Sequence, residues 1–172
     1  MTGKIRESLK TAIEYFAGKP VTAVEVGVAA GANAKRIFLA LNIQRMFLID
    51  SWKLEYNVEC YKWLIRTCQE FEGYMNKAII WRHDAIAAAS LFRDGAIDYL
   101  YLDDNHAPAH VLKELEAYYP KVSSGGIISG HDWADNNRAS VAVKQFCKER
   151  NIKYHFAQNE GEEVADWWFY KP

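Results

Sequence analysis

Apolar and polar positions along the chain follow two alternating periods. Short apolar runs, typical of buried strands, alternate with stretches in which apolar residues recur every three or four positions, as on one face of a helix. The helical period predicts helices over residues 5–16, 35–41, 59–71, 85–92, 109–119 and 140–150. The apolar runs predict strands over residues 22–28, 46–49, 78–81, 97–102, 126–129, 153–157 and 165–170.

This alternation predicts an α/β fold. We expect a Rossmann-like, doubly wound sheet of seven strands, mostly parallel, with helices on both faces. The last two strands are separated only by a turn around residues 159–161 and not by a helix, so the last strand should run antiparallel. The chain has no internal repeat, low-complexity stretch or linker, which predicts one domain over residues 1–172.

Composition narrows the choice of partners and compartment. Half of the 172 residues are hydrophobic, which supports a packed core, and 21 basic against 22 acidic residues give a net charge of −1. This balance offers no broad basic surface, so nucleic-acid and membrane partners are disfavoured. The three cysteines form no CxxC pair, and the N-terminus does not resemble a signal peptide. We therefore expect a cytoplasmic protein with reduced thiols.

Polar residues gather where the predicted strands end. In open α/β sheets the ligand binds outside the carboxyl ends of the strands, so these segments are the candidate site. They are residues 27–31, 50–52, 83–85, 103–106 and 130–133.

The first three segments suit a nucleoside-containing cofactor. Gly27 and Gly31 are spaced as GxxxG rather than as the GxGxxG of dinucleotide binders, and form either a ligand-binding turn or only a tight strand–helix turn. Asp50 is placed to accept hydrogen bonds from ribose hydroxyls, or to cap the next segment. Trp52 could stack on adenine or belong to the core. Asp84 could border the adenine or cap a helix that begins at Ala85.

Three motifs together resemble a family of enzymes. They read VEVGVAAG over residues 24–31, LDDNH over residues 102–106 and GGIISGHDW over residues 125–133. In this order the motifs resemble those of a small family of class I methyltransferases, which use S-adenosylmethionine. The second motif departs from the family pattern in two ways. Asp104-Asn105 stand where the family usually has Gly-Asp, and Ala107-Pro108-Ala109 replace the aromatic and acidic residues that usually follow the His.

The resemblance assigns roles to individual residues. It implies that Glu25, Gly27, Val28 and Gly31 surround the methionine part of S-adenosylmethionine. Asp50 would hold the ribose beside Ser51 and Trp52, Asp84 and Ala85 would edge the adenine, and Asp103 would lie beside the reacting methyl group.

An oxygen acceptor must lose a proton during methyl transfer, and the sequence offers two ways to remove it. Either His106 or His131 acts as general base with Asp132 orienting it, or a divalent metal such as Mg²⁺ or Mn²⁺, held by Asp103, His131 and Asp132, lowers the pKa of the acceptor. Asp103, His106 and His131 are thus the candidate catalytic residues. A third alternative gives Asp132 a capping role and leaves His131 at the rim, and we interpret His110 as a helix surface residue.

These observations favour an O-methyltransferase that acts on a small molecule or a sugar-like (glycan) hydroxyl. The alternatives are an S-adenosylmethionine-binding interaction protein without activity, and a nicotinamide-dependent oxidoreductase. Little sequence remains to cover an acceptor, so the acceptor site is expected to be open, or to be completed by a second copy of the chain in a homodimer. Its candidate lining is Trp52, Tyr56, Trp133 and residues 136–138.

Overall fold

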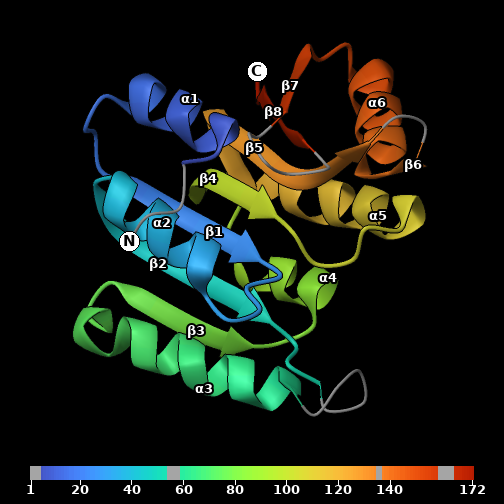
Figure 1. The fold of residues 1–172 in the computed structure, drawn as a ribbon. Helices are drawn as coiled ribbons and strands as arrows, with labels where there is room; N and C mark the ends of the chain where they lie inside the picture. Colours follow the sequence, from blue (N-terminus) through green and yellow to red (C-terminus); the bar gives the residue numbers. More distant parts are fainter. Residues whose placement is uncertain (1–4, 54–58, 135–136, 159–164) are drawn as a thin grey trace.

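Seven strands of the described chain form the main sheet, in the order β3-β2-β1-β4-β5-β8-β7 (Figure 1). In the computed structural model, residues 5–53, 59–134, 137–158 and 165–172 are described. Neighbouring strands pair in parallel except around β8, which is antiparallel to both β5 and β7. The strands are β1 (Val21–Val26), β2 (Ile43–Asp50), β3 (Ala78–Arg82), β4 (Ile97–Leu102), β5 (Val122–Ala134), β7 (Tyr154–Gln158) and β8 (Ala165–Tyr170).

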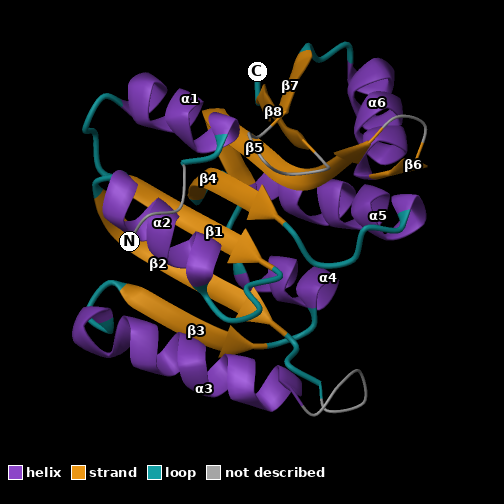
Figure 2. Ribbon diagram, viewed as in Figure 1, coloured by secondary structure: helices purple, strands orange, loops and turns teal. Residues whose placement is uncertain are grey.

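Helices cover both faces of this sheet, as Figure 2 shows. Buried residues of α1, α2 and α3 form one hydrophobic cluster with one face of the sheet, and those of α4, α5 and α6 form a second cluster on the other. The helices are α1 (Glu7–Phe16), α2 (Ala32–Ala40), α3 (Glu59–Phe71), α4 (Ala85–Ala88), α5 (Pro108–Tyr118) and α6 (Ala139–Arg150). The doubly wound sheet with an antiparallel last strand is therefore confirmed.

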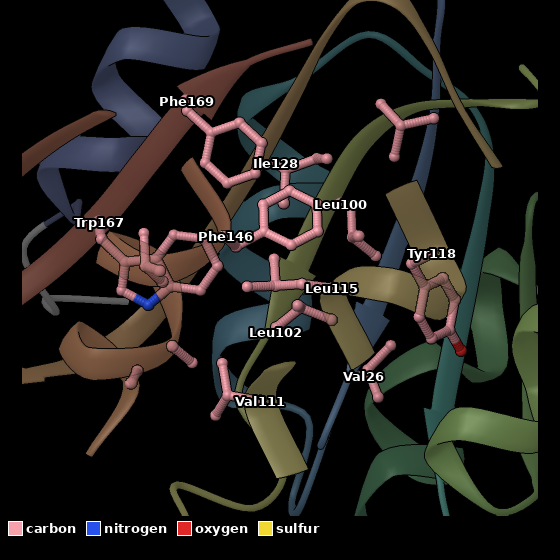
Figure 3. Packing of buried hydrophobic residues seen from close by; sticks show 14 of the residues in the cluster. Val26, Leu100, Leu102, Val111, Leu115, Tyr118, Ile128, Phe146, Trp167 and Phe169 are labelled. Atoms are coloured by element: carbon pink, nitrogen blue, oxygen red, sulfur yellow. The ribbon is translucent and has the colours of Figure 1, made fainter. Parts of the chain in front are cut away.

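The central strand β4 shows why the fold holds together. Val111 and Leu115 of α5 pack with Leu100 and Leu102 on one side of β4 (Figure 3). Tyr99 and Tyr101 point to the other cluster, and all four of these strand residues are buried. A parallel strand covered on both faces reads as a continuous apolar run, which is the pattern of residues 97–102 in the sequence.

The bounds of several predicted elements were wrong, most of all in the two described next, and one short strand was missed. The expected strand 126–129 is the middle of the much longer β5 (Val122–Ala134), which also pairs with a two-residue strand β6 (Asn137–Arg138) that the pattern did not predict. The expected helix 85–92 is only a four-residue α4 followed by a 3₁₀ turn over Ala89–Leu91. The turn expected at residues 159–161 lies outside the described residues.

The topology determines where a ligand can bind. The chain runs from β1 outward through β2 to β3, and then returns to place β4 on the other side of β1. The crevice at such a switch point, beyond the carboxyl ends of the strands, is the usual ligand site of these sheets. Gly27 directly follows β1, and Asp103 directly follows β4.

Candidate active site

The glycine turn after β1 is packed against the segment that follows β4. Gly27 has φ of +85°, and a Cβ atom there would lie 2.2 Å from the carbonyl oxygen of Asp103, so no other residue fits without displacing backbone. Gly31 begins α2. The turn between them is fixed by its Ala29 carbonyl, which accepts hydrogen bonds from the Trp52 indole (2.8 Å) and the Thr67 hydroxyl (3.0 Å).

Glu25 is a buried carboxyl group near the end of β1, next to this turn. Its Oε1 accepts a hydrogen bond from the Asn33 side chain at 3.2 Å, whereas its Oε2 is buried without a hydrogen-bond partner among the described residues. Burial, with the charge of Asp103 nearby, raises the pKa of Glu25 to about 8. A buried carboxylate oxygen without a partner is costly, so this position suits a ligand that brings a positive charge or a donor.

Asp50 ties the ends of β1 and β2 together. One carboxylate oxygen accepts from the backbone N–H of Ala29 and the other from that of Trp52, each at 2.8 Å. A carboxylate has lone pairs beyond these two, so Asp50 can still accept from a ligand hydroxyl.

Trp52 does not offer its ring to a ligand in this structure. The side chain is 1% exposed and belongs to the cluster under α1 and α2. The expected stacking of Trp52 on adenine is therefore wrong. The indole instead supports the glycine turn through its hydrogen bond to the Ala29 carbonyl. Trp133 is likewise buried and packs against Tyr154 and Phe156, so it does not line an open acceptor site. Tyr56 and Asn136 lie outside the described residues, as do the side chains of Asn137 and Arg138.

Asp84 caps helix α4, accepting from the backbone N–H of Ala87 at 3.0 Å. The capping alternative is therefore observed. The same residue also lines a hollow of about 340 Å³ between the ends of β2, β3 and β4, together with Ser51, Lys53, Ala85, Asp104, Asn105, His106 and His110. This volume is within the range of small-ligand pockets. Capping and ligand contact are therefore compatible at Asp84.

The second half of the site is built around Asp132. Its Oδ2 lies 2.7 Å from Nδ1 of His106 and 3.5 Å from Nδ1 of His131. Nδ1 of His131 also lies 3.8 Å from a carboxylate oxygen of Asp103. The four residues come from the ends of β4 and β5, as the sequence predicts, and the structure brings them together.

A β-bulge in β5 sets the direction of the His131 and Asp132 side chains. Gly130 pairs with Trp167 and Trp133 pairs with Ala165, so His131 and Asp132 together stand opposite the single residue Asp166. Asp132 has φ of +61°, which is uncommon for a residue other than glycine. Bulges of this kind re-aim side chains and are common beside active sites. The sequence pattern predicts a loop for His131 and Asp132, and this placement was wrong.

Charge in this half of the site is unevenly distributed. Burial raises the pKa of Asp103 to about 6, although His131 and Arg6 oppose the shift. Burial would also raise the pKa of Asp132, but hydrogen bonds from His106 and His131 hold it well below its usual range. Asp132 is thus the carboxylate that stays ionised and can orient a histidine.

Arg6 is a member of the site that the sequence did not reveal. Its guanidinium hydrogen-bonds the Tyr101 hydroxyl and lies 3.6 Å from Asp103 and 3.7 Å from Asp166. Arg6 precedes α1 and Asp166 is on β8, so the contact joins distant parts of the chain. No local pattern signals such a contact. Asn33 and Thr67 were missed for the same reason.

His110 also differs from its predicted role. It lies on α5 and lines the hollow, with Nε2 at 3.2 Å from the carboxylate of Asp104. It is therefore not a plain helix surface residue.

No helix among the described residues is long and apolar enough to cross a membrane.

Residues 24–133 match the family described as "Methyltransferase domain", which covers the glycine turn, Asp50, Asp84, Asp103 and the His-Asp-Trp segment. The chain belongs to this methyltransferase family. A comparison with curated proteins found no match. The doubly wound sheet described above agrees with this family.

Solved structures share this fold at low sequence identity. A Streptococcus mutans protein described as a methyltransferase, in complex with S-adenosylhomocysteine, is 13% identical with a TM-score of 0.70, and the match covers 98% of this chain and 100% of that one. An rRNA methylase from Streptococcus thermophilus is 12% identical with a TM-score of 0.70 and coverage of 98% and 99%. A Staphylococcus aureus protein described as a caffeoyl-CoA O-methyltransferase is 14% identical with a TM-score of 0.67 and coverage of 98% and 85%.

Proposed function

We propose that this methyltransferase transfers the methyl group of S-adenosylmethionine to a hydroxyl of a small molecule or a sugar-like compound, with His106 as general base. The observation that carries the proposal is the 2.7 Å contact between Nδ1 of His106 and the carboxylate of Asp132. In this contact Nδ1 of the neutral His106 ring donates to the carboxylate, so Nε2 is the ring nitrogen that can accept a proton. Asp132 fixes the orientation of the ring and stabilises its charged form.

The cofactor cradle supports the donor half of this proposal. S-adenosylmethionine carries an α-ammonium group, and Oε2 of Glu25, which has no hydrogen-bond partner among the described residues, is a buried acceptor suited to such a cation. The carboxyl group of Asp103 lies close enough to Glu25 to contribute to the rise of its pKa, so a second carboxyl group borders the same region. We therefore assign the methionine part to Glu25, Gly27, Val28, Gly31 and Asp103.

The adenosine part fits the hollow beside β3. Asp50 would accept from the ribose, and Ser51, Asp84 and Ala85 would border the base. When bound, S-adenosylmethionine supplies an electrophilic methyl group on its sulfonium, so the chain itself has to align the acceptor and remove its proton.

Proton removal by His106 is favoured over removal assisted by a metal at Asp103, His131 and Asp132. These three residues place possible ligand atoms within 4.8 Å of one another, which fits a divalent ion such as Mg²⁺ or Mn²⁺. However, Arg6 already lies beside Asp103, and His106 already contacts Asp132. A metal would have to compete with both contacts.

Proton acceptance by His106 requires a hydroxyl acceptor on the His106 side of the hollow, beside the part that Ser51, Asp84 and Ala85 would offer to the adenosine. His106 is about half exposed, and the hollow beside it has a mixed polar lining. A small polar acceptor suits such a site. An oligonucleotide does not, because the chain carries a net charge of −1 and the hollow is bordered by Asp84 and Asp104.

The test is a transfer assay with methyl-labelled S-adenosylmethionine. The purified chain is incubated with panels of phenols, sugars and glycans, and separately with RNA and protein, and the labelled product is identified. We expect label on a small hydroxyl compound, strongly reduced in His106→Gln and retained in the control His155→Gln, because His155 lies on β7 against Trp168.

Three outcomes would overturn parts of the proposal. Label on RNA or protein would replace the acceptor class. Cofactor binding without transfer to any acceptor would favour the inactive interaction protein. The metal-assisted scheme would be favoured if a chelator abolished turnover of the wild type and Mg²⁺ or Mn²⁺ restored it. In that case the ions should not restore turnover in Asp103→Asn.

A further inference from the structure

A second group of possible metal ligands lies beside the loop that follows β4. It consists of Asp104 in that loop and of His110 and Glu114 on α5, which are one helical turn apart. Nε2 of His110 lies 3.2 Å from Oδ2 of Asp104 and 3.7 Å from Oε1 of Glu114, and all three atoms lie within 4.8 Å of one another. None of these three residues belongs to the cluster of Asp103, His131 and Asp132.

Glu114 occupies an unusual position for an acidic side chain. It is only 1% exposed, and its Oε1, which points at His110, has no hydrogen-bond partner among the described residues. Nε2 of His110 is also buried, and it faces the carboxylates of both Asp104 and Glu114. Placing a carboxyl group in the interior in this way is costly unless it is paired or coordinates a metal.

The spacing of the three atoms suits a metal ion. Zinc is bound by histidine nitrogen and carboxylate oxygen at about 2.0–2.2 Å, so two ligand atoms of a tetrahedral site lie about 3.4 Å apart. The separations of 3.2 Å and 3.7 Å bracket this value. One imidazole with two carboxylates is a donor set for transition-metal ions rather than for Ca²⁺.

We propose that Asp104, His110 and Glu114 form a site for a divalent transition-metal ion such as Zn²⁺. Asp104 and His110 line the hollow beside β3, and Glu114 lines a small space next to Asp104, so the three residues border the hollow. Three protein ligands with one open position are the usual arrangement of a zinc site that stays accessible. The inference concerns metal binding alone and does not depend on methyl transfer.

The test is a calorimetric titration of the full chain, stripped of metal with a chelator, with ZnCl₂. A parallel titration with CoCl₂ monitors visible absorption, which reports tetrahedral coordination. We expect one ion at this site with a dissociation constant in the micromolar range or below. His110→Ala and Glu114→Gln should each weaken binding at least about tenfold, a loss in the range seen when the surroundings of a metal are altered.

Two control variants test whether the ion binds at these three residues and not elsewhere on the chain. Glu116 lies on the same helix and pairs with Arg150 in an exposed position, so Glu116→Gln should bind Zn²⁺ as the wild type does. Asp132→Asn disables the cluster of Asp103, His131 and Asp132 and should also keep the ion. Circular dichroism checks the fold of each variant, and if Glu114→Gln does not fold, the partly exposed His110 carries the test.

Several results would overturn the proposal. The first is the absence of Zn²⁺ binding at concentrations up to about 100 µM, at which any structural zinc site would be filled. The second is unchanged binding in His110→Ala. The third is loss of binding in Asp132→Asn. The first result would mean that Glu114 is buried as an uncharged carboxyl group, as the rise of its pKa on burial allows. The other two would place the ion elsewhere.

Discussion

Gly27 lies against the backbone of Asp103 so closely that a Cβ atom at position 27 would be 2.2 Å from the Asp103 carbonyl oxygen. The glycine turn that we propose to hold the cofactor is thus in direct contact with the segment after β4 that carries Asp103. Any change that separates them should disturb cofactor binding and catalysis together.

Replacing Gly27 by alanine tests this contact. Gly27→Ala introduces both an unfavourable positive φ and a backbone collision, and we expect it to cost about 3 kcal/mol or more of the free energy of unfolding. Gly18→Ala is the matched control, because Gly18 has φ of +78° but open space where the Cβ would be. It should cost only about 1 kcal/mol. Equal losses in urea denaturation would show that the collision is relieved at no cost.

Arg6 should stabilise the fold from a position outside the three motifs. Arg6→Met leaves Asp103 and Asp166 without the guanidinium that lies between them, and should cost about 2–4 kcal/mol. Lys10→Met removes only an exposed pair with Glu7 and should change stability by less than about 1 kcal/mol. Chemical denaturation of both variants measures the difference, and similar values would refute a structural role for Arg6.

Glu25 should make the cofactor-free protein less stable as the pH rises. Its pKa is about 8 in the folded chain and 4.5 for the isolated group, so between these values only the unfolded chain ionises. The contribution of the neutral carboxyl is complete below about pH 4.5 and is lost as the pH rises through 8. The loss is at most about 5 kcal/mol, since each unit of pKa difference corresponds to about 1.4 kcal/mol.

The variant Glu25→Gln cannot ionise and isolates this effect. Its stability, measured by denaturation between pH 5 and about pH 9, should fall less steeply than that of wild type. The two curves should diverge mainly above pH 5, with the variant the more stable at high pH. Parallel curves would show that Glu25 is not buried as an uncharged group.

The motifs in the sequence predict the frame of the site but not its connections. The apolar run of β4 and the polar residues at the strand ends place Glu25, Asp50 and Asp103 near the carboxyl ends of neighbouring strands. Arg6 and the bulge at Asp132 were missed because each depends on a partner far away in the sequence. The sequence could not decide between adenine stacking and the core for Trp52, because its indole has both an apolar face and a donor, and only the fold shows that Ala29 accepts from it.

His106 and Asp132 should act as one unit in turnover. His106→Gln and Asp132→Asn are each expected to lower the rate with an identified acceptor by about 10²–10⁴-fold, the usual effect of losing a general base. The double variant should be hardly slower than either single one, because residues that act together are not additive. Binding of S-adenosylhomocysteine should stay within about twofold, well below a tenfold step of 1.4 kcal/mol. Independent, additive losses would contradict this pairing.

Cofactor binding at Glu25 is best measured by calorimetric titration with S-adenosylhomocysteine at pH 7, run in two buffers of different ionisation enthalpy. We predict micromolar binding that releases close to one proton, because Glu25 is mostly protonated in the free protein and should ionise beside the α-ammonium group. In Glu25→Gln the proton release should vanish and the affinity should fall at least about tenfold, or 1.4 kcal/mol, and Asp50→Ala should also bind weakly. No binding to wild type, or equal affinity and equal proton release in Glu25→Gln, would contradict this assignment of the cofactor site.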